Sequence, residues 1–316
     1  MHAVVVDNGA LRLEGRPDPV PGDTEVLVSV RAAGLNGADM LQRRGQYPAP
    51  PGAPPDVLGL ELAGEVIGVG ARVQAARPGD RVMALVAGGA QATMAVVEET
   101  HLLPIPDPVP WAEAGGFPEV FSTAYDALFT RCGLSVGDRL LVTGAAGGVG
   151  VAAVQLAAAA GATVVASVRD EARREEVGAL GAHEVIGADE VGAHGPYDVV
   201  LELVGAASLP QALGALATGA RVAVIGVGSG SRIELDLRVL MATRATIGGS
   251  TLRARSRVEK AAVAAAVRAH VLPLLATGRV RVPVLGTYPL AEAAAAYDRF
   301  TEGRKLGKLV LVAGGS

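Results

Sequence analysis

Residues 140–168 read LLVTGAAGGVGVAAVQLAAAAGATVVASV and contain no charged side chain. A run of this length would be long enough to cross a membrane, which takes about 20 apolar residues. Glycines at positions 144, 147, 148, 150 and 161 interrupt it, so it is not one continuous helix. We interpret it as a strand at 139–144, a helix at 148–160 and a second strand at 162–168.

Strands and helices continue to alternate after this run. The pattern predicts helices at 171–181 and 209–218 and strands at 183–187, 197–205, 220–228 and 245–252. Such alternation is typical of right-handed crossovers in a mostly parallel sheet that is covered on both faces. The sequence therefore predicts an α/β domain with a doubly wound parallel sheet.

The first 115 or so residues differ, because short strands separated by proline and glycine predict a β-rich domain there. These strands are expected at 3–7, 25–35, 61–70, 80–86 and 92–99. The proline-rich segment 47–60 is expected to be an irregular surface loop that borders a site.

The C-terminal part predicts two helices and a last strand. Ser256 and Glu259 have the spacing of a capping box, which predicts the start of a long helix with a kink near Pro273. Another helix is expected at 290–303, and a final strand at 307–312 could return to the first domain.

Composition excludes several classes of function. The chain has 316 residues, half of them hydrophobic, and a formal net charge of −4, so no broad basic surface for nucleic acid or anionic lipid is expected. Cys132 is the only cysteine, which excludes an internal disulfide and a zinc site with several thiolates and fits a reducing cytoplasm. The N-terminus lacks the pattern of a secretion signal.

The glycine run carries the chemistry of this sequence. It lies between a predicted strand and a predicted helix, where small residues let the backbone approach a pyrophosphate and the helix N-terminus attracts negative charge. Ala145, Gly147 and Gly150 match the dinucleotide fingerprint, with alanine at its first position. Glycines needed only for tight packing are the alternative.

The residues after the second strand indicate which dinucleotide is bound. An acidic residue there would bind the ribose of NADH. Here Ser167, Arg169 and Arg173 surround the strand end, and guanidinium groups bind phosphate in a planar, bidentate way. These residues favour NADPH over NADH, although Asp170 lies among them and the arginines could instead begin a solvated helix.

The chain resembles the zinc-free medium-chain dehydrogenase/reductase superfamily, in its quinone oxidoreductase (zeta-crystallin-like) branch. The resemblance rests on RAAGLNGADMLQRRGQYPAP (31–50), GLELAGEVIGVG (59–70), PGDRV (78–82), STAYDAL (122–128), GAAGGVGVAAVQLA (144–157), GAHEVIG (181–187), GSTLRARS (249–256) and GKLVLV (307–312). It implies a GroES-like catalytic domain of residues 1–118 and 257–316, a Rossmann domain of residues 119–256, an active-site cleft where they meet, and a homodimer.

The resemblance also bears on metal binding. In zinc alcohol dehydrogenases of this superfamily two cysteines and a histidine bind the catalytic zinc, and the matching positions here are Asn36, Leu60 and Glu119. Leucine cannot ligate a metal, and an amide with one carboxylate does not make a three-ligand zinc site. We therefore expect no metal, and we expect Glu61, which matches a glutamate near that zinc, to remain as a structural hydrogen-bond acceptor.

A reductase without a Lewis acid needs an acceptor that is already activated for hydride addition, such as a quinone or an alkene conjugated to a carbonyl. The resemblance implies Tyr47 and Asn36 as the catalytic residues, although Tyr47 could instead pack under the proline loop and Asn36 could stabilise a turn. Ala188 stands where family members often carry a tyrosine or histidine near the adenine phosphate. The alternatives are an enoyl-thioester reductase of the polyketide or fatty-acid type and an NADPH-binding protein with little catalysis. The expected cofactor-binding residues are Thr123, Ala146, Gly147, Gly148, Val149, Ser167, Arg169, Arg173, Ile225, Gly226, Val227, Ser250, Thr251 and Leu252.

Overall fold

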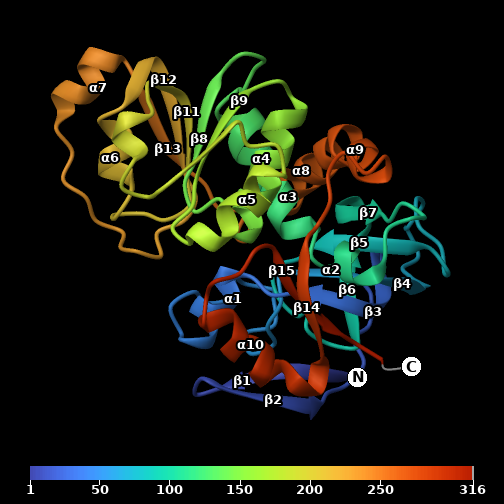
Figure 1. Ribbon diagram of the computed structural model, residues 1–316. Helices are drawn as coiled ribbons and strands as arrows, with labels where there is room; N and C mark the ends of the chain where they lie inside the picture. Colours follow the sequence, from blue (N-terminus) through green and yellow to red (C-terminus); the bar gives the residue numbers. More distant parts are fainter. Residues whose placement is uncertain (315–316) are drawn as a thin grey trace. The chain divides into compact units, whose positions relative to one another are not determined.

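The computed structural model describes residues 1–314 and divides into two compact units (Figure 1). Unit 1 comprises Met1–Ser122, Leu252–Gly303 and the chain from Gly307 onward, and unit 2 comprises Thr123–Thr251 and Arg304–Leu306. The expected domain limits at 118/119 and 256/257 fall a few residues from these boundaries. Three stretches of the chain, the first of them distant in sequence from the other two, thus build the larger unit.

Unit 2 is built on a six-stranded parallel sheet with the order β10-β9-β8-β11-β12-β13. The strands are β8 (Arg139–Val142), β9 (Thr163–Ser167), β10 (Glu184–Ile186), β11 (Tyr197–Glu202), β12 (Leu216–Val224) and β13 (Thr246–Gly249). Strand order reverses between β8 and β11, which is the switch point where doubly wound sheets bind ligands. The predicted doubly wound Rossmann sheet is confirmed.

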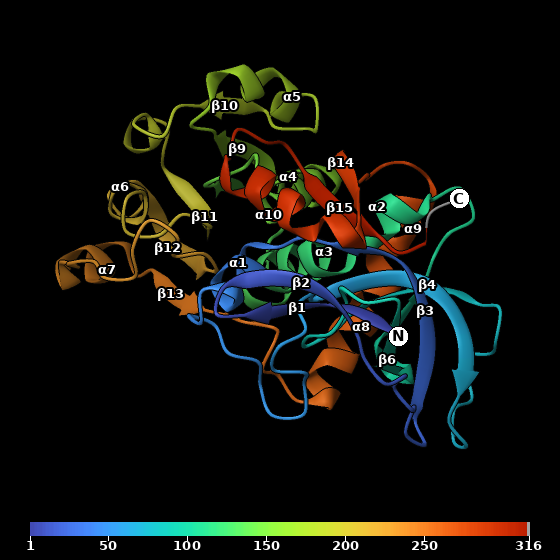
Figure 2. The same cartoon turned by 90° about the horizontal axis from the view of Figure 1, so that it is seen from below.

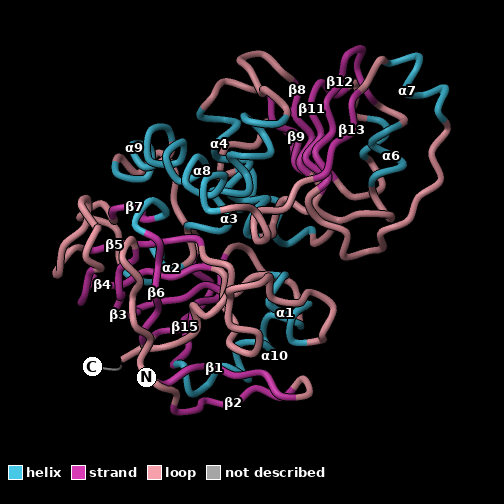
Figure 3. The backbone as a smooth tube through the Cα atoms, turned by 180° about the vertical axis from the view of Figure 1, so that it is seen from behind, coloured by secondary structure: helices cyan, strands magenta, loops and turns pink. Residues whose placement is uncertain are grey.

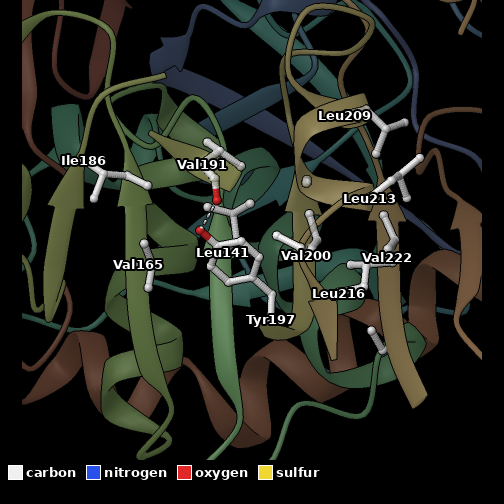
Figure 4. Packing of buried hydrophobic residues seen from close by; sticks show 13 residues of the cluster. Leu141, Val165, Ile186, Val191, Tyr197, Val200, Leu209, Leu213, Leu216 and Val222 are labelled. Atoms are coloured by element: carbon white, nitrogen blue, oxygen red, sulfur yellow. Dashed lines mark hydrogen bonds between the residues drawn. The ribbon is translucent and has the colours of Figure 1, made fainter. Parts of the chain in front are cut away.

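Both faces of this sheet are buried, which explains the uncharged runs in the sequence. Val165, Leu141, Val200 and Val222 are neighbours in register across four strands and lie in one hydrophobic cluster. In the same cluster, Tyr197 donates from its hydroxyl to Val191 O at 2.7 Å (Figure 4). The alternate residues of the strands, such as Leu140 and Val199, are equally buried.

Helices cover the two sides of the sheet, with α4 on one side and α6 and α7 on the other (Figure 3). The helices of unit 2 are α4 (Gly148–Ala159), α5 (Arg174–Gly178), α6 (Leu209–Leu213) and α7 (Leu237–Thr243), with short 3-10 turns η3 (Glu171–Arg173) and η4 (Val191–Ala193). A π-helical turn, η2 (Asp126–Arg131), was not expected from the sequence. Among the described residues, no helix is both long and apolar enough to span a membrane.

Unit 1 contains a seven-stranded sheet with the order β14-β15-β3-β4-β5-β7, in which β6 also pairs with β3. Its strands are β3 (Glu25–Gly34), β4 (Glu61–Val69), β5 (Arg81–Leu85), β6 (Met94–Glu98), β7 (Leu102–Pro104), β14 (Val284–Pro289) and β15 (Lys308–Val312). The C-terminal β15 pairs with β3 antiparallel and with β14 parallel, as Figure 2 shows for β14 and β15. The expected return of the last strand to the first domain is confirmed.

A hairpin and several helices complete unit 1. The hairpin joins β1 (His2–Asp7) to β2 (Ala10–Gly15) through Asn8 and Gly9, which have φ angles of 47° and 81°, as a type I′ turn requires. The helices are α1 (Gly37–Arg43), α2 (Trp111–Gly115), α8 (Arg257–His270), α9 (Leu272–Ala276) and α10 (Ala293–Thr301), and α3 (Pro118–Tyr125) continues into unit 2. The Ser256 capping box is confirmed, but α8 ends before Pro273 and a separate helix follows.

Candidate functional site

The cofactor candidates of unit 2 gather at one edge of its sheet. Most of them follow the carboxyl ends of β8, β9, β12 and β13, which are parallel neighbours or near neighbours in the sheet. Ligands of open α/β sheets bind outside these strand ends. The structure thus brings together the residues Ala146, Gly147, Gly148, Val149, Ser167, Arg169, Ile225, Gly226, Val227, Ser250 and Thr251.

The turn between β8 and α4 is shaped by its glycines. A Cβ on Gly150 would lie 2.6 Å from Ala145 Cα and 2.7 Å from Gly144 O, so only glycine lets α4 pack this closely on the turn. Gly147 is the N-cap and has no side chain to cap the first backbone N–H groups of the helix. Those N–H groups have no partner inside the helix and attract negative charge. The turn therefore offers backbone N–H groups at the start of α4 that no capping side chain occupies.

Glu202 is a buried carboxylate at the switch point that the sequence analysis missed. Its Oε1 accepts hydrogen bonds from Thr143 Oγ1 at 2.9 Å and from the backbone N–H groups of Val204 and Gly205 at 2.7 Å. Ser208 Oγ donates to both carboxylate oxygens, at 2.7 and 2.8 Å. Glu202 therefore connects the end of β8 to the loop after β11 and fixes the backbone at the carboxyl ends of these two strands. An acidic residue directly after the apolar run Val199–Leu201 was the available signal.

The residues after β9 differ in the hydrogen bonds and ion pairs that they make within the protein. Arg169 is exposed and makes no hydrogen bond or ion pair with the rest of residues 1–314. Arg173 pairs with Glu176 at 2.5 Å, a contact at i,i+3 spacing that the sequence already displays. The Asp170 carboxylate accepts from Ala172 N at 3.3 Å and caps η3, while Arg174 Nε donates to Val168 O at 3.4 Å. Arg169 is thus the guanidinium that remains available to a phosphate.

The other cofactor candidates line neighbouring turns. Ile225 N and Gly226 N both donate to Glu202 O, at 2.9 and 3.1 Å, which holds the end of β12 against β11. Ser250 Oγ donates to Asp126 Oδ2 at 3.2 Å. Thr123 is 8% exposed at the start of unit 2, whereas Leu252 is buried and belongs to unit 1.

Asn36 lies in a buried polar cluster of unit 1. Lys308 Nζ is 2.6 Å from both Asn36 Oδ1 and Glu61 Oε1 and donates to Leu35 O at 2.8 Å. Asn36 Nδ2 donates to Glu61 Oε1 at 2.9 Å, and Glu119 N donates to Glu61 Oε2 at 2.9 Å. Both the oxygen and the nitrogen of the Asn36 amide are therefore hydrogen-bonded within the protein. The expectation that Glu61 is a structural hydrogen-bond acceptor is confirmed.

Asp39 completes this cluster and has an unusual proton affinity. It is fully buried, and its two oxygens accept from the backbone N–H groups of Asn36 at 2.8 Å and Gly59 at 3.2 Å. Burial raises the pKa of Asp39 to about 7, while the positive charge of Lys308 acts to lower it. The negative charge of a second carboxylate, Glu61, also raises the pKa of Asp39. Protonation of this carboxyl group is therefore easier than that of an ordinary aspartate.

Tyr47 is half-buried at the beginning of the proline-rich segment, which is irregular as expected. Its hydroxyl has no hydrogen-bond partner among residues 1–314, and its ring centroid lies 5.0 Å from Arg253 Cζ. Burial raises the pKa of Tyr47, and the Arg253 charge opposes that rise. The phenol is therefore protonated at neutral pH and available as a donor.

The donor atoms for a catalytic metal are scarce. Leu60 is apolar and Asn36 is bound to Lys308, so the positions that would carry zinc ligands offer no set of three. Within residues 1–314, no group of three or more His, Cys, Asp or Glu side chains could hold a metal ion.

Comparison with known proteins gives two family matches and close full-length relatives. Residues 22–107 match the alcohol dehydrogenase GroES-like domain, and residues 148–268 match the zinc-binding dehydrogenase family. Quinone oxidoreductase of Lama guanicoe is 33% identical over 93% of this chain and 90% of its own length. Acryloyl-coenzyme A reductase of Metallosphaera sedula is 32% identical, with 98% and 99% covered. The solved structure of mycobacterial Rv1454c complexed with NADPH has 29% identity and a TM-score of 0.87 over 99% of this chain and 100% of that one.

Proposed function

Because the chain belongs to the medium-chain dehydrogenase/reductase family, with quinone oxidoreductases among its relatives, we propose that it is an NADPH-dependent reductase of quinones or enones. The observation that carries this proposal is the glycine turn at the start of α4, next to the end of β9, where Arg169 is exposed and unpaired. Among residues 1–314, no group of three or more His, Cys, Asp or Glu side chains could hold a metal ion. The names of the quinone oxidoreductase relatives support the acceptor class.

The residues present fit a reduced dinucleotide. In this proposal the N–H groups of Gly148 and Val149 bind the diphosphate, Arg169 binds the 2′-phosphate, and the turns after β12 and β13 line the nicotinamide half. When bound, reduced nicotinamide supplies a hydride. The NADPH complex of Rv1454c supports the choice of cofactor by likeness.

The protein's own contribution is to orient the acceptor and to deliver a proton. We assign the proton to Tyr47 Oη, whose raised pKa keeps it protonated until hydride transfer makes the acceptor oxygen basic. Asn36 is assigned a role behind the site, because its amide is held by Lys308 and Glu61. The reaction then needs no Lewis acid, and zinc independence is part of the proposal. The resemblance supports a homodimer, and the lone cysteine supports a cytoplasmic location.

An enoyl-thioester reductase is the second candidate. It is favoured by the likeness to acryloyl-coenzyme A reductase, which covers nearly the whole of both chains. This acceptor is also an alkene conjugated to a carbonyl, so the same hydride and proton transfers apply to it.

The deciding experiment follows NADPH oxidation with a quinone, a small enone and an enoyl-CoA thioester, with and without a chelator. We expect the quinone or the enone to give the highest kcat/KM and the chelator to leave every rate unchanged. A higher kcat/KM for the thioester would favour the second candidate. No oxidation with any acceptor would leave a nucleotide-binding protein with little catalysis, and inhibition by the chelator would refute zinc independence.

Arg169→Ala is expected to raise the Kd for NADPH by about tenfold or more, because a charge-assisted hydrogen bond contributes about 1.5–3 kcal/mol. The Kd for NADH should not change, since NADH lacks the 2′-phosphate. Titration calorimetry with both cofactors measures the two values. Arg238→Ala is the control, because Arg238 is an exposed arginine of unit 2 that pairs with Asp236 on α7. An equal loss for both cofactors would contradict the assignment of Arg169.

A further inference from the structure

Arg253 is a buried arginine with an unusual set of partners. It is 4% exposed, and its Nε donates to Ala87 O at 2.8 Å, its Nη1 to Tyr47 O at 3.0 Å and its Nη2 to Gln42 Oε1 at 2.6 Å. The three acceptors belong to the turn after β5, the proline-rich segment and α1. One guanidinium therefore connects three segments of unit 1.

All three acceptors are neutral, so no carboxylate pairs directly with this cation, and the buried Asp39 acts on it only through space. Burying a charge without an opposite charge costs free energy, and an apolar side chain of similar size would avoid that cost. The pKa of Arg253 is accordingly lowered by burial. A positive charge kept in such a place, directly over the Tyr47 ring, indicates a role beyond filling space.

The segment that Arg253 holds has few backbone donors of its own. Between Gln46 and Val57 the chain contains five prolines, at 48, 50, 51, 54 and 55, and a proline has no backbone N–H to donate. Gln42 Nε2, on the side chain that also binds Arg253, donates to Pro55 O at 3.2 Å. The two ends are also held, because Gln46 N donates to Leu41 O and Val6 N donates to Asp56 O, each at 2.9 Å. Between them, Arg253 is the donor that binds the backbone of Tyr47 itself.

The turn after β5 is shaped to receive this arrangement. A Cβ on Gly88 would lie 3.4 Å from Pro54 O and 3.7 Å from Arg253 Nη2, and a Cβ on Gly89 would lie 3.1 Å from Pro54 Cγ. Gly89, with a φ of 83°, thus leaves room for Pro54, whereas a Cβ on Gly88 would make only ordinary contacts with Pro54 and the guanidinium.

We propose that Arg253 is a positioning residue that fixes residues 46–57, which contain the prolines of the proline-rich segment, and holds the Tyr47 ring for proton donation. The donation part of this inference rests on the proposed function. In the step, the Tyr47 Oη–H bond breaks and an O–H bond forms on the acceptor, which takes the hydride from the reduced cofactor. The electron pair of the broken bond stays on Oη as a phenolate, which the Arg253 charge stabilises, and water then returns the proton.

The first test is hydrogen exchange of the intact protein, followed by mass spectrometry. Arg253→Met should accelerate exchange of the amides in 46–57 and 86–89 by about tenfold or more, because their local opening becomes easier. Arg81→Met is the matched control: its guanidinium also lies over an aromatic ring, 4.5 Å from the Trp111 centroid, and donates to Val109 O at 2.9 Å. Exchange of 46–57 should be unchanged in that variant. Equal exchange in Arg253→Met and the wild type would overturn the proposal.

The second test is a double-mutant cycle with Tyr47→Phe. Arg253→Met should lower kcat by about tenfold to a hundredfold, as expected when a reacting group is misplaced by about 1 Å. In the Tyr47→Phe background the same change should cost about twofold or less, because the hydroxyl that it positions is gone. Independent effects that multiply would show that Arg253 does not act through Tyr47.

The two tests separate the failure of this inference from that of the proposed function. If the wild type reduces no acceptor, the proposed function and the proton transfer fail together, while hydrogen exchange still decides whether Arg253 fixes the segment. If Arg253→Met does not fold, Arg253→Lys is judged by the same two criteria, because a lysine keeps the charge but cannot donate to all three acceptors in a planar fork.

Discussion

Lys308→Met is expected to lower the free energy of unfolding of unit 1 by about 3–5 kcal/mol, because removing one partner of a buried ion pair leaves an uncompensated charge. Lys308 is 3% exposed and Glu61 is fully buried, with 2.6 Å between Nζ and Oε1. The change also removes the donor to Asn36 Oδ1 and Leu35 O. Denaturant unfolding followed by fluorescence measures the loss, since the only tryptophan, Trp111, lies in unit 1.

Two further variants test the cause of that loss. Lys308→Met combined with Glu61→Gln should recover much of the stability, because the charge of Glu61 is then no longer buried without its partner. Lys260→Met, at a half-buried lysine on α8 without an ion pair among residues 1–314, should cost less than about 1 kcal/mol. A loss as large in Lys260→Met as in Lys308→Met would contradict the argument.

The effect of Lys308→Met should also depend on pH through Asp39. The folded-state pKa of Asp39 is about 7, above its ordinary value of 3.8, so its contribution to stability is present below about pH 4 and is lost as the pH rises through 7. Lys308 lowers this pKa, and its removal should raise it further. The difference in stability between variant and wild type should therefore grow from pH 5 to pH 8.

Local patterns in the sequence were sufficient to predict most of the fold. The alternation of apolar strands with helices after residue 139 predicts the parallel sheet, because strands buried on both faces must be apolar throughout. The capping box at Ser256 predicts the start of α8, since its two hydrogen bonds involve residues three apart. Such features can be predicted because they depend only on residues that are close together in the sequence.

The candidate site was less predictable where it depends on residues far apart in the sequence. The resemblance implied Asn36 as a catalytic residue, and no pattern in the sequence indicated that its amide is bound by Lys308, 272 residues away along the chain. Arg253 binds Gln42, which lies 211 residues away along the chain. The sequence around either residue does not predict this contact. The ion pair of Arg173 with Glu176 could be predicted from their i,i+3 spacing. This pairing makes Arg173 a weaker candidate than Arg169 for binding a phosphate.

Gly150→Ala is expected to weaken NADPH binding by about a hundredfold or more, since two charge-assisted hydrogen bonds of about 1.5–3 kcal/mol each depend on the position of the α4 N-terminus. The new Cβ would meet Ala145 Cα, Gly144 O and Ala145 C at 2.6–2.8 Å. These are backbone atoms of the turn between β8 and α4 and cannot rotate away, so either α4 or this turn must move. Titration of cofactor fluorescence measures the affinity, and thermal unfolding shows whether unit 2 is still folded.

Gly192→Ala provides the control, because Gly192 also lies in a helical turn of unit 2 and nothing stands within 4 Å of an added Cβ there. Its affinity for NADPH should equal that of the wild type. A stability loss of about 1–3 kcal/mol is expected for Gly150→Ala from overpacking, so binding is compared below the unfolding transition of each variant. If Gly150→Ala folds and binds NADPH normally, the diphosphate is not held at the start of α4, and the assignment of the cofactor to this turn is wrong.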